Sequence, residues 1–127
     1  MIALRPMRLA DLSTVMELEE ELFAPDTWTA AMYREELALT DTRHYLVAED
    51  DGTVVGYAGL IAYDDEAHVA TIGVTGARQG EGTGALLLDA LLAEVVQRQR
   101  FELLGPDPLY LRRPDAVPPT AIKAVTR

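Results

Sequence analysis

Apolar residues recur three and four positions apart in three segments of the chain, and this spacing predicts three helices. The first helix follows Asp11, which can cap it, and its apolar face holds Leu12, Val15, Met16, Leu18, Leu22 and Phe23. Its solvent side is expected to hold Glu17, Glu19, Glu20 and Glu21. The second helix follows Thr29 and carries Met32, Tyr33 and Leu37. The third runs from about residue 83 to residue 97, with a predicted buried stripe of Leu86, Leu87, Leu91, Leu92, Val95 and Val96.

Shorter apolar segments, separated by turn residues, predict strands over residues 2–7, 44–49, 53–62, 67–74 and 101–104. Asp50-Asp51-Gly52 separates the second and third of these and supplies residues that tolerate the positive φ of a hairpin turn. The element order predicts an α/β sandwich with a mixed, mostly antiparallel sheet flanked by helices. Beyond Gly105 no periodicity predicts an element, so we expect the C-terminal part of this fold to be incomplete.

Length and composition favour one globular domain. The chain has 127 residues, of which 49% are hydrophobic and 25% charged. No apolar run approaches the ~20 residues of a membrane span, and the N-terminus lacks a signal-peptide pattern. There is no cysteine, and the two histidines, His44 and His68, lie far apart in the sequence. We therefore expect a cytoplasmic protein with no metal and no membrane partner.

The charge is acidic but unevenly distributed. A net charge of −10 disfavours a nucleic-acid partner and suits a basic protein or peptide. Residues 1–97 hold 5 basic and 18 acidic side chains, whereas residues 98–127 hold 6 basic and 3 acidic ones and five of the seven prolines. The composition therefore predicts a main domain over residues 1–104 and a divergent, proline-rich segment over residues 105–127.

A glycine-rich turn, Gln79-Gly80-Glu81-Gly82-Thr83-Gly84, joins the strand at 67–74 to the third helix. Glycines allow close approach to main-chain N–H groups, and a helix N-terminus attracts anions, so the turn predicts a phosphate or pyrophosphate site. A plain structural turn is the alternative. A P-loop is excluded because Gly84 is followed by Ala85 and Leu86, and the glycine spacing differs from that of a dinucleotide-binding fold.

The turn fits the pattern Q/R-x-x-G-x-G/A and resembles the acetyl-CoA signature of the GCN5-related N-acetyltransferase (GNAT) superfamily. The resemblance covers about residues 2–97. Within the superfamily the chain is most similar to the RimI-type ribosomal-protein-alanine N-acetyltransferases, through residues 23–37, 55–59 and 70–74. The resemblance implies acetyl-CoA as co-substrate and main-chain pairing of Ile72, Gly73 and Val74 with its pantetheine arm. It also implies that Gln79 opens the turn and that the pyrophosphate is held by Gly80, Glu81, Gly82, Thr83, Gly84 and Ala85.

The catalytic residues implied by the resemblance lie where the chain departs from the family pattern. Glu102 is the nearest counterpart of the family's base and Tyr110 of its acid, although the connection between them is shorter than usual. Glu66 and His68 are alternative bases, and Trp28 is a candidate for the acceptor groove. Each of these residues also has an ordinary structural interpretation, as a solvated charge or a packing side chain.

The resemblance therefore implies transfer of acetyl from acetyl-CoA to a protein N-terminal α-amino group, such as the N-terminal alanine of a ribosomal protein. With no cysteine to carry an acyl group, direct attack by the amine is the simpler route. Two alternatives stay open. One is an acetyltransferase for a small amine, and the other is a non-catalytic acyl-CoA-binding or degenerate domain.

Overall fold

The structure, a computed structural model, describes residues 1–63 and 66–98. Its elements in chain order are β1 (Ile2–Pro6), the 3-10 helix η1 (Leu9–Asp11), α1 (Leu12–Phe23), α2 (Ala30–Ala38), β2 (Arg43–Asp50), β3 (Thr53–Ala62), β4 (Ala67–Val74), the 3-10 helix η2 (Gly76–Arg78) and α3 (Thr83–Arg98). Each helix and strand predicted within these residues is present. The predicted strand at 101–104 and the predicted boundary after residue 104 lie outside the described residues.

The described strands form one sheet in the order β1-β2-β3-β4, and every neighbouring pair is antiparallel. The turn between β2 and β3 has positive φ at Asp51 (52°) and Gly52 (83°), as its sequence predicted. The β3–β4 register shifts where Gly59 pairs with Thr71 and Leu60 with Val69, which leaves Ala70 as an extra residue in β4. This register shift is a β-bulge in the middle of β4.

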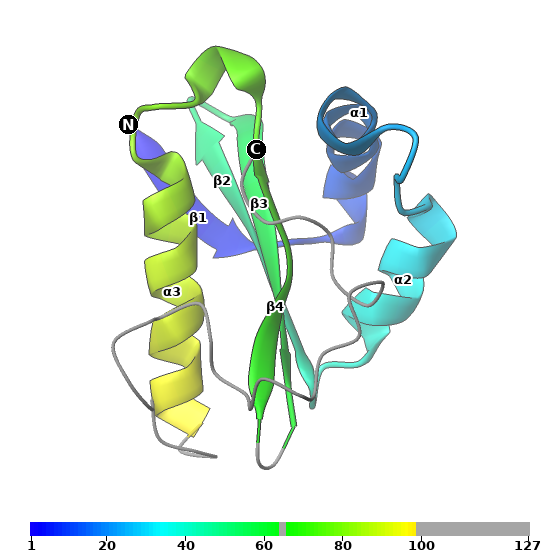
Figure 1. Cartoon of the computed structure of the whole chain (residues 1–127), viewed down its shortest axis with the longest axis vertical. Coiled ribbons are helices and arrows are strands. Elements are labelled where there is room, and N and C mark those ends of the chain that lie inside the picture. Colours follow the sequence, from blue (N-terminus) through cyan, green and yellow to red (C-terminus); the bar gives the residue numbers. More distant parts are fainter. Residues whose placement is uncertain (64–65, 99–127) are drawn as a thin grey trace.

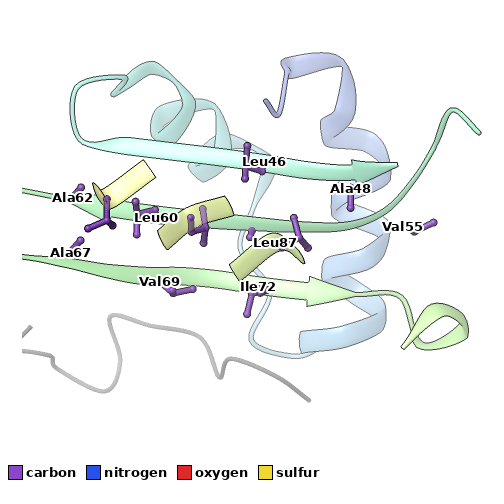
Figure 2. Packing of buried hydrophobic residues seen from close by; sticks show 12 residues of the cluster. Leu46, Ala48, Val55, Leu60, Ala62, Ala67, Val69, Ile72 and Leu87 are labelled. Atoms are coloured by element: carbon purple, nitrogen blue, oxygen red, sulfur yellow. The ribbon is translucent and has the colours of Figure 1, made fainter. Parts of the chain in front are cut away.

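Helix α3 lies on one side of the sheet, and α1 and α2 lie on the other (Figure 1). On the α3 side, Leu87, Leu91 and Val95 are buried against side chains from β2, β3 and β4. Figure 2 shows Leu46, Leu60 and Ile72 of this cluster on three adjacent strands, with Leu87 of α3. The predicted stripe of α3 was too wide: Leu86 is 47% and Val96 57% exposed.

The opposite face of the sheet packs against α1 and α2 through a second, more aromatic cluster. Its buried members are Met7, Leu12, Val15, Leu18, Phe23, Tyr33, Tyr45, Val47, Val54 and Tyr57. The ring of Tyr33 makes edge-on contacts with the rings of Tyr45 and Tyr57. The two clusters together sandwich the sheet, as predicted. No helix in the described part of the chain has the length and apolar character that crossing a membrane requires.

The caps of the two N-terminal helices differ from each other. Thr29 caps α2 as predicted, because its hydroxyl accepts the Met32 N–H at 3.1 Å. Asp11 occupies the cap position of α1 but makes no side-chain cap bond, which corrects the prediction. Its carboxylate instead accepts the N–H of Arg8 at 2.7 Å and two bonds from the Arg5 guanidinium at 2.8 Å. These hydrogen bonds lower the pKa of Asp11, and the bonds from Arg5 have the largest effect.

Of the acidic residues expected on the solvent side of α1, Glu19 is buried, and Glu21 is exposed but takes part in hydrogen bonds. Glu19 is fully buried, and its carboxylate accepts the hydroxyls of Tyr33 at 2.6 Å and Tyr57 at 2.8 Å and the Trp28 N–H at 2.9 Å. Burial, as the largest effect, and the nearby Glu19 carboxylate both raise the pKa of Tyr57. Glu21 accepts hydrogen bonds from residues that follow β4. The solvent-side prediction was wrong for Glu19.

Candidate functional site

The glycine-rich turn is open on the side where a ligand would lie. Gly80 and Gly82 have φ of +84° and +88°, and a Cβ added at either would meet no atom of the described residues within 4 Å, apart from the glycine's chain neighbours. A side chain at these positions would therefore strain the backbone and occupy the open space, without colliding with the protein. The glycines thus keep a space next to the main chain free.

Unpaired N–H groups point to an anion in that space. The first hydrogen bond of α3 runs from the Leu86 N–H to the Gly82 carbonyl at 3.0 Å. Among the described residues, none provides a hydrogen-bond acceptor to the N–H groups of residues 80–85. These groups stand at the N-terminus of a 16-residue helix, where the peptide dipoles favour negative charge. The turn therefore fits a phosphate or diphosphate.

The side chains of Gln79 and of Glu21 in α1 hold the turn and the residues before it in this conformation. The amide of Gln79 donates to the Val74 carbonyl at 2.9 Å, which fixes the start of the turn to the end of β4. The Glu21 carboxylate accepts the Gly76 N–H at 2.7 Å and the Thr75 hydroxyl at 3.0 Å. Gln79 thus supports the turn with its side chain.

Arg78 adds an ionic connection. Its guanidinium lies 2.8 Å from Glu81 within the turn and 2.9 Å from Asp50 at the β2–β3 hairpin. These contacts raise the pKa of Arg78, and the contact with Glu81 has the largest effect. Glu81 is exposed, and its negative charge is offset by this arginine, so the turn remains compatible with an anion.

The strand before the turn has an open edge. Within the described residues β4 pairs only with β3, so its other edge has no partner strand there. The Gly73 carbonyl lies on the β3 side, because a Cβ built on Gly56 would be 3.0 Å from it. Alternate residues of a strand point their main-chain groups to opposite edges, so those of Ile72 and Val74 face the open edge.

The site residues predicted on β4 and the turn have distinct surroundings. The side chain of Ile72 is buried in the α3 cluster. A Cβ on Gly73 would lie 2.9 Å from Leu22 Cδ1, so this glycine allows α1 to approach β4 closely. Thr83 is buried, and its hydroxyl has no partner among the described residues. Gly84 lies near Val74, since a Cβ there would be 3.9 Å from Val74 Cγ2. Ala85 is exposed in the first turn of α3.

Only some of the candidate catalytic residues lie in the part of the chain that the structure describes. Glu102 and Tyr110 lie outside the described residues. His68 is buried in β4, and Glu66 is half-buried just before it. The Trp28 ring packs 5.2 Å from that of Tyr33. In residues 1–63 and 66–98, no group of three or more acidic or histidine side chains is placed to hold a metal.

Sequence reasoning missed the roles of Glu19 and Glu21. The signal for Glu19 was its spacing, since it lies four residues after Val15 and four before Phe23, both on the buried face. No comparable signal marked Glu21, because its partners lie more than fifty residues away in sequence.

Comparison with known proteins identifies the family of the chain. The profile of the Acetyltransferase (GNAT) family matches residues 12–107. A RimI N-alpha-acetyltransferase of Mycobacterium tuberculosis (strain ATCC 25618 / H37Rv) is 43% identical over 88 residues, which are 65% of this chain and 55% of that protein. A Bacillus subtilis (strain 168) protein, provisionally named a [ribosomal protein bS18]-alanine N-acetyltransferase, is 35% identical over 85 residues, 67% of this chain and 56% of its own length.

The fold is also found among solved structures. A GNAT family acetyltransferase from Brucella melitensis, in complex with acetyl-CoA, matches with a TM-score of 0.63 and 24% identity, over 77% of this chain and 70% of that one. This chain spans about half the length of the curated relatives it matches. The family profile covers most of the chain, and so the chain belongs to the acetyltransferase (GNAT) family.

Proposed function

We propose that this chain transfers the acetyl group of acetyl-CoA to the N-terminal α-amino group of a protein. The observation that supports this most directly is the open turn at residues 80–85, whose N–H groups at the start of α3 have no acceptor among the described residues. A diphosphate is the anionic group of coenzyme A that such a turn suits. The family's solved structures include one bound to acetyl-CoA.

The described residues suggest how the co-substrate would be held. The N–H groups of residues 80–85 would bind the pyrophosphate, and Gln79 would keep the turn in place. The main-chain groups of Ile72 and the N–H of Val74, whose carbonyl accepts the Gln79 amide, would pair with the amides of the pantetheine arm along the open edge of β4. Gly73, between them, would allow α1 to approach the strand.

The transfer makes three chemical demands: a neutral amine, stabilisation of a developing oxyanion and a proton for the departing thiolate. The family resemblance assigns the base to Glu102 and the acid to Tyr110. Among the described residues, Glu66 and His68 are the alternative bases.

A protein acceptor is supported by two observations. The curated relatives are named for α-amino acetylation, in one case of a ribosomal protein alanine. The net charge of −10 would attract a basic protein, and ribosomal proteins belong to that class. We therefore propose the N-terminal alanine of a ribosomal protein as acceptor, and the cytoplasm as the compartment, in line with the lack of cysteine.

The test combines binding and turnover with the full chain. Calorimetric titration should show acetyl-CoA binding, and a free-thiol assay should show turnover with a peptide that begins with alanine. The same peptide with an acetylated N-terminus is the matched control and should be inert. Binding without turnover on any amine would favour a non-catalytic domain. Turnover on small amines alone would replace the protein acceptor, and failure to bind would refute the proposal.

A further inference from the structure

The two faces of the sheet at β4 differ in whether an acceptor amine could approach the open edge of the strand. On one face, Val69 and Ile72 are packed into the cluster covered by α3 (Figure 2). An arm paired with the open edge is therefore shielded on that face by the helix. An acceptor amine must approach from the other face of the sheet, on the side of α1 and α2 (Figure 1).

The register of the sheet identifies the β4 residues on that approach. His68 pairs with Ile61, Thr71 with Gly59, and Gly73 with Tyr57. Tyr57 belongs to the cluster beneath α1 and α2. A Cβ on Gly59 would lie 2.2 Å from the ring of Tyr45, which belongs to the same cluster. Since paired residues point to the same face, His68, Thr71 and Gly73 all face the acceptor side.

The direction of the arm places its reactive end near His68. The glycine-rich turn follows the C-terminal end of β4, so an arm that passes Val74 and then Ile72 continues toward Ala70 and the start of the strand. His68 lies roughly 10 Å along the strand from Ile72, because a strand rises about 3.3 Å per residue and the extra residue Ala70 shortens the path.

Of His68, Thr71 and Gly73, only one is a candidate for proton transfer. Of these three residues, only His68 carries a side chain, the neutral imidazole, that can accept a proton as a base. The buried hydroxyl of Thr71 has no partner among the described residues, which suits a site where a water or ligand atom supplies one. The other histidine, His44, pairs with Leu60 and therefore lies on the α3 face, 3.6 Å from Glu94.

From this placement, and resting on the proposed acetyl transfer, we propose that His68, in place of the Glu102 that the resemblance implies, is the base that deprotonates the acceptor amine. The imidazole accepts one proton from the ammonium group, directly or through a water. The amine nitrogen then bonds to the thioester carbonyl carbon, the carbon–sulfur bond breaks, and the sulfur takes the second amine proton. The products are the amide, the free thiol and one proton, which the imidazolium returns to solvent.

The decisive variants are His68→Gln and, as the matched control, His44→Gln. In the full chain, His68→Gln should lower kcat about 10²- to 10⁴-fold, the usual contribution of a general base, with the Kd for acetyl-CoA within twofold of wild type. In wild type, kcat/KM should fall as the pH drops, because a protonated imidazole cannot accept the amine proton. The His68→Gln variant should lose that limb, and His44→Gln should retain both the rate and the limb.

A second measurement does not depend on turnover. Because the chain has only two histidines, their ring signals in an NMR spectrum can be assigned with the same two variants. Addition of acetyl-CoA should shift the signals of His68 and leave those of His44 unchanged.

The outcomes separate this inference from the proposed function. If the wild-type chain fails to bind acetyl-CoA, both ideas fall. If it binds and turns over but His68→Gln keeps its rate and pH profile, the role of His68 is refuted and the transferase stands. Binding with no transfer to any amine also refutes the role of His68, while the cofactor site stands. A large loss in Glu102→Gln, with none in His68→Gln, would assign the base to Glu102.

Discussion

Gly82 offers a test of the proposed pyrophosphate site at the scale of a single residue. A Cβ at this position would meet no protein atom within 4 Å, so Gly82→Ala should cost only the strain of positive φ, about 1–2 kcal/mol of unfolding free energy. A bound diphosphate would, however, collide with the methyl group. We therefore expect acetyl-CoA affinity to fall at least tenfold by calorimetry.

Gly52 is the matched control for this substitution. Its φ of +83° is close to that of Gly82, and a Cβ there also meets nothing within 4 Å. Gly52→Ala should lose the same stability in a urea titration and keep wild-type affinity. Equal affinities in the two variants would place the pyrophosphate elsewhere.

Glu19 is the residue whose burial should matter most to stability. Its carboxylate accepts two phenol hydroxyls and one main-chain N–H, whereas a glutamine would present an NH₂ group to at least one of these donors. Glu19→Gln should therefore lower the free energy of unfolding by about 2–4 kcal/mol, since a buried donor loses its charged acceptor. The exposed neighbour Glu20 is the control, and Glu20→Gln should change stability by less than about 0.5 kcal/mol in the same urea titration. Similar stabilities for the two variants would contradict the burial of Glu19.

At the scale of elements, the apolar spacing of α3 predicted that a helix forms but not which of its apolar residues are buried. The spacing of its leucines predicted the helix and placed its start at Thr83. It could not decide between the neighbours Leu86 and Leu87, because both fall within the width of an apolar stripe. The sheet decides, since the fully buried apolar residues of α3 follow a four-residue step at Leu87, Leu91 and Val95.

That difference predicts unequal effects of the same substitution within one helix. Leu91 is fully buried, so Leu91→Ala should cost about 2–5 kcal/mol by opening a cavity beneath α3. Leu86→Ala, at a half-exposed position, should cost less than about 1 kcal/mol. Thermal or urea unfolding of both variants measures the difference. A larger loss for Leu86→Ala would contradict the helix orientation.

The candidate site was predictable from the sequence where it depends on the main chain. Glycine spacing and the strand–turn–helix order indicated the open turn, because those properties are local. The supports of the turn were not predictable, since Glu21 joins residues that only the tertiary fold brings together. Likewise, the face on which His68 lies depends on the extra residue at Ala70, which periodicity does not reveal.

At the scale of the whole molecule, the buried phenols and the Arg5–Asp11 pair set the pH range of stability. Burial raises the pKa of Tyr33, Tyr45 and Tyr57 above the ordinary value of 10.0. Above pH 10 the unfolded chain releases phenol protons that the folded chain retains, so the free energy of unfolding should fall as the pH rises. In the other direction, the pKa of Asp11 lies below its ordinary value of 3.8, so its contribution is present above that pH and is lost as the pH falls below it.

Urea titrations between pH 3 and pH 11.5 would test this, with a stability plateau expected between about pH 4 and pH 10. Each phenol that stays protonated in the folded state should add about 1.4 kcal/mol per pH unit to the alkaline slope. Tyr45→Phe removes one such phenol and should reduce the alkaline slope by about 1.4 kcal/mol per pH unit. Asp11→Asn should reduce the loss of stability at acid pH. An alkaline slope that Tyr45→Phe leaves unchanged would mean that Tyr45 ionises in the folded state, and its burial beside Glu36 would then be incorrect.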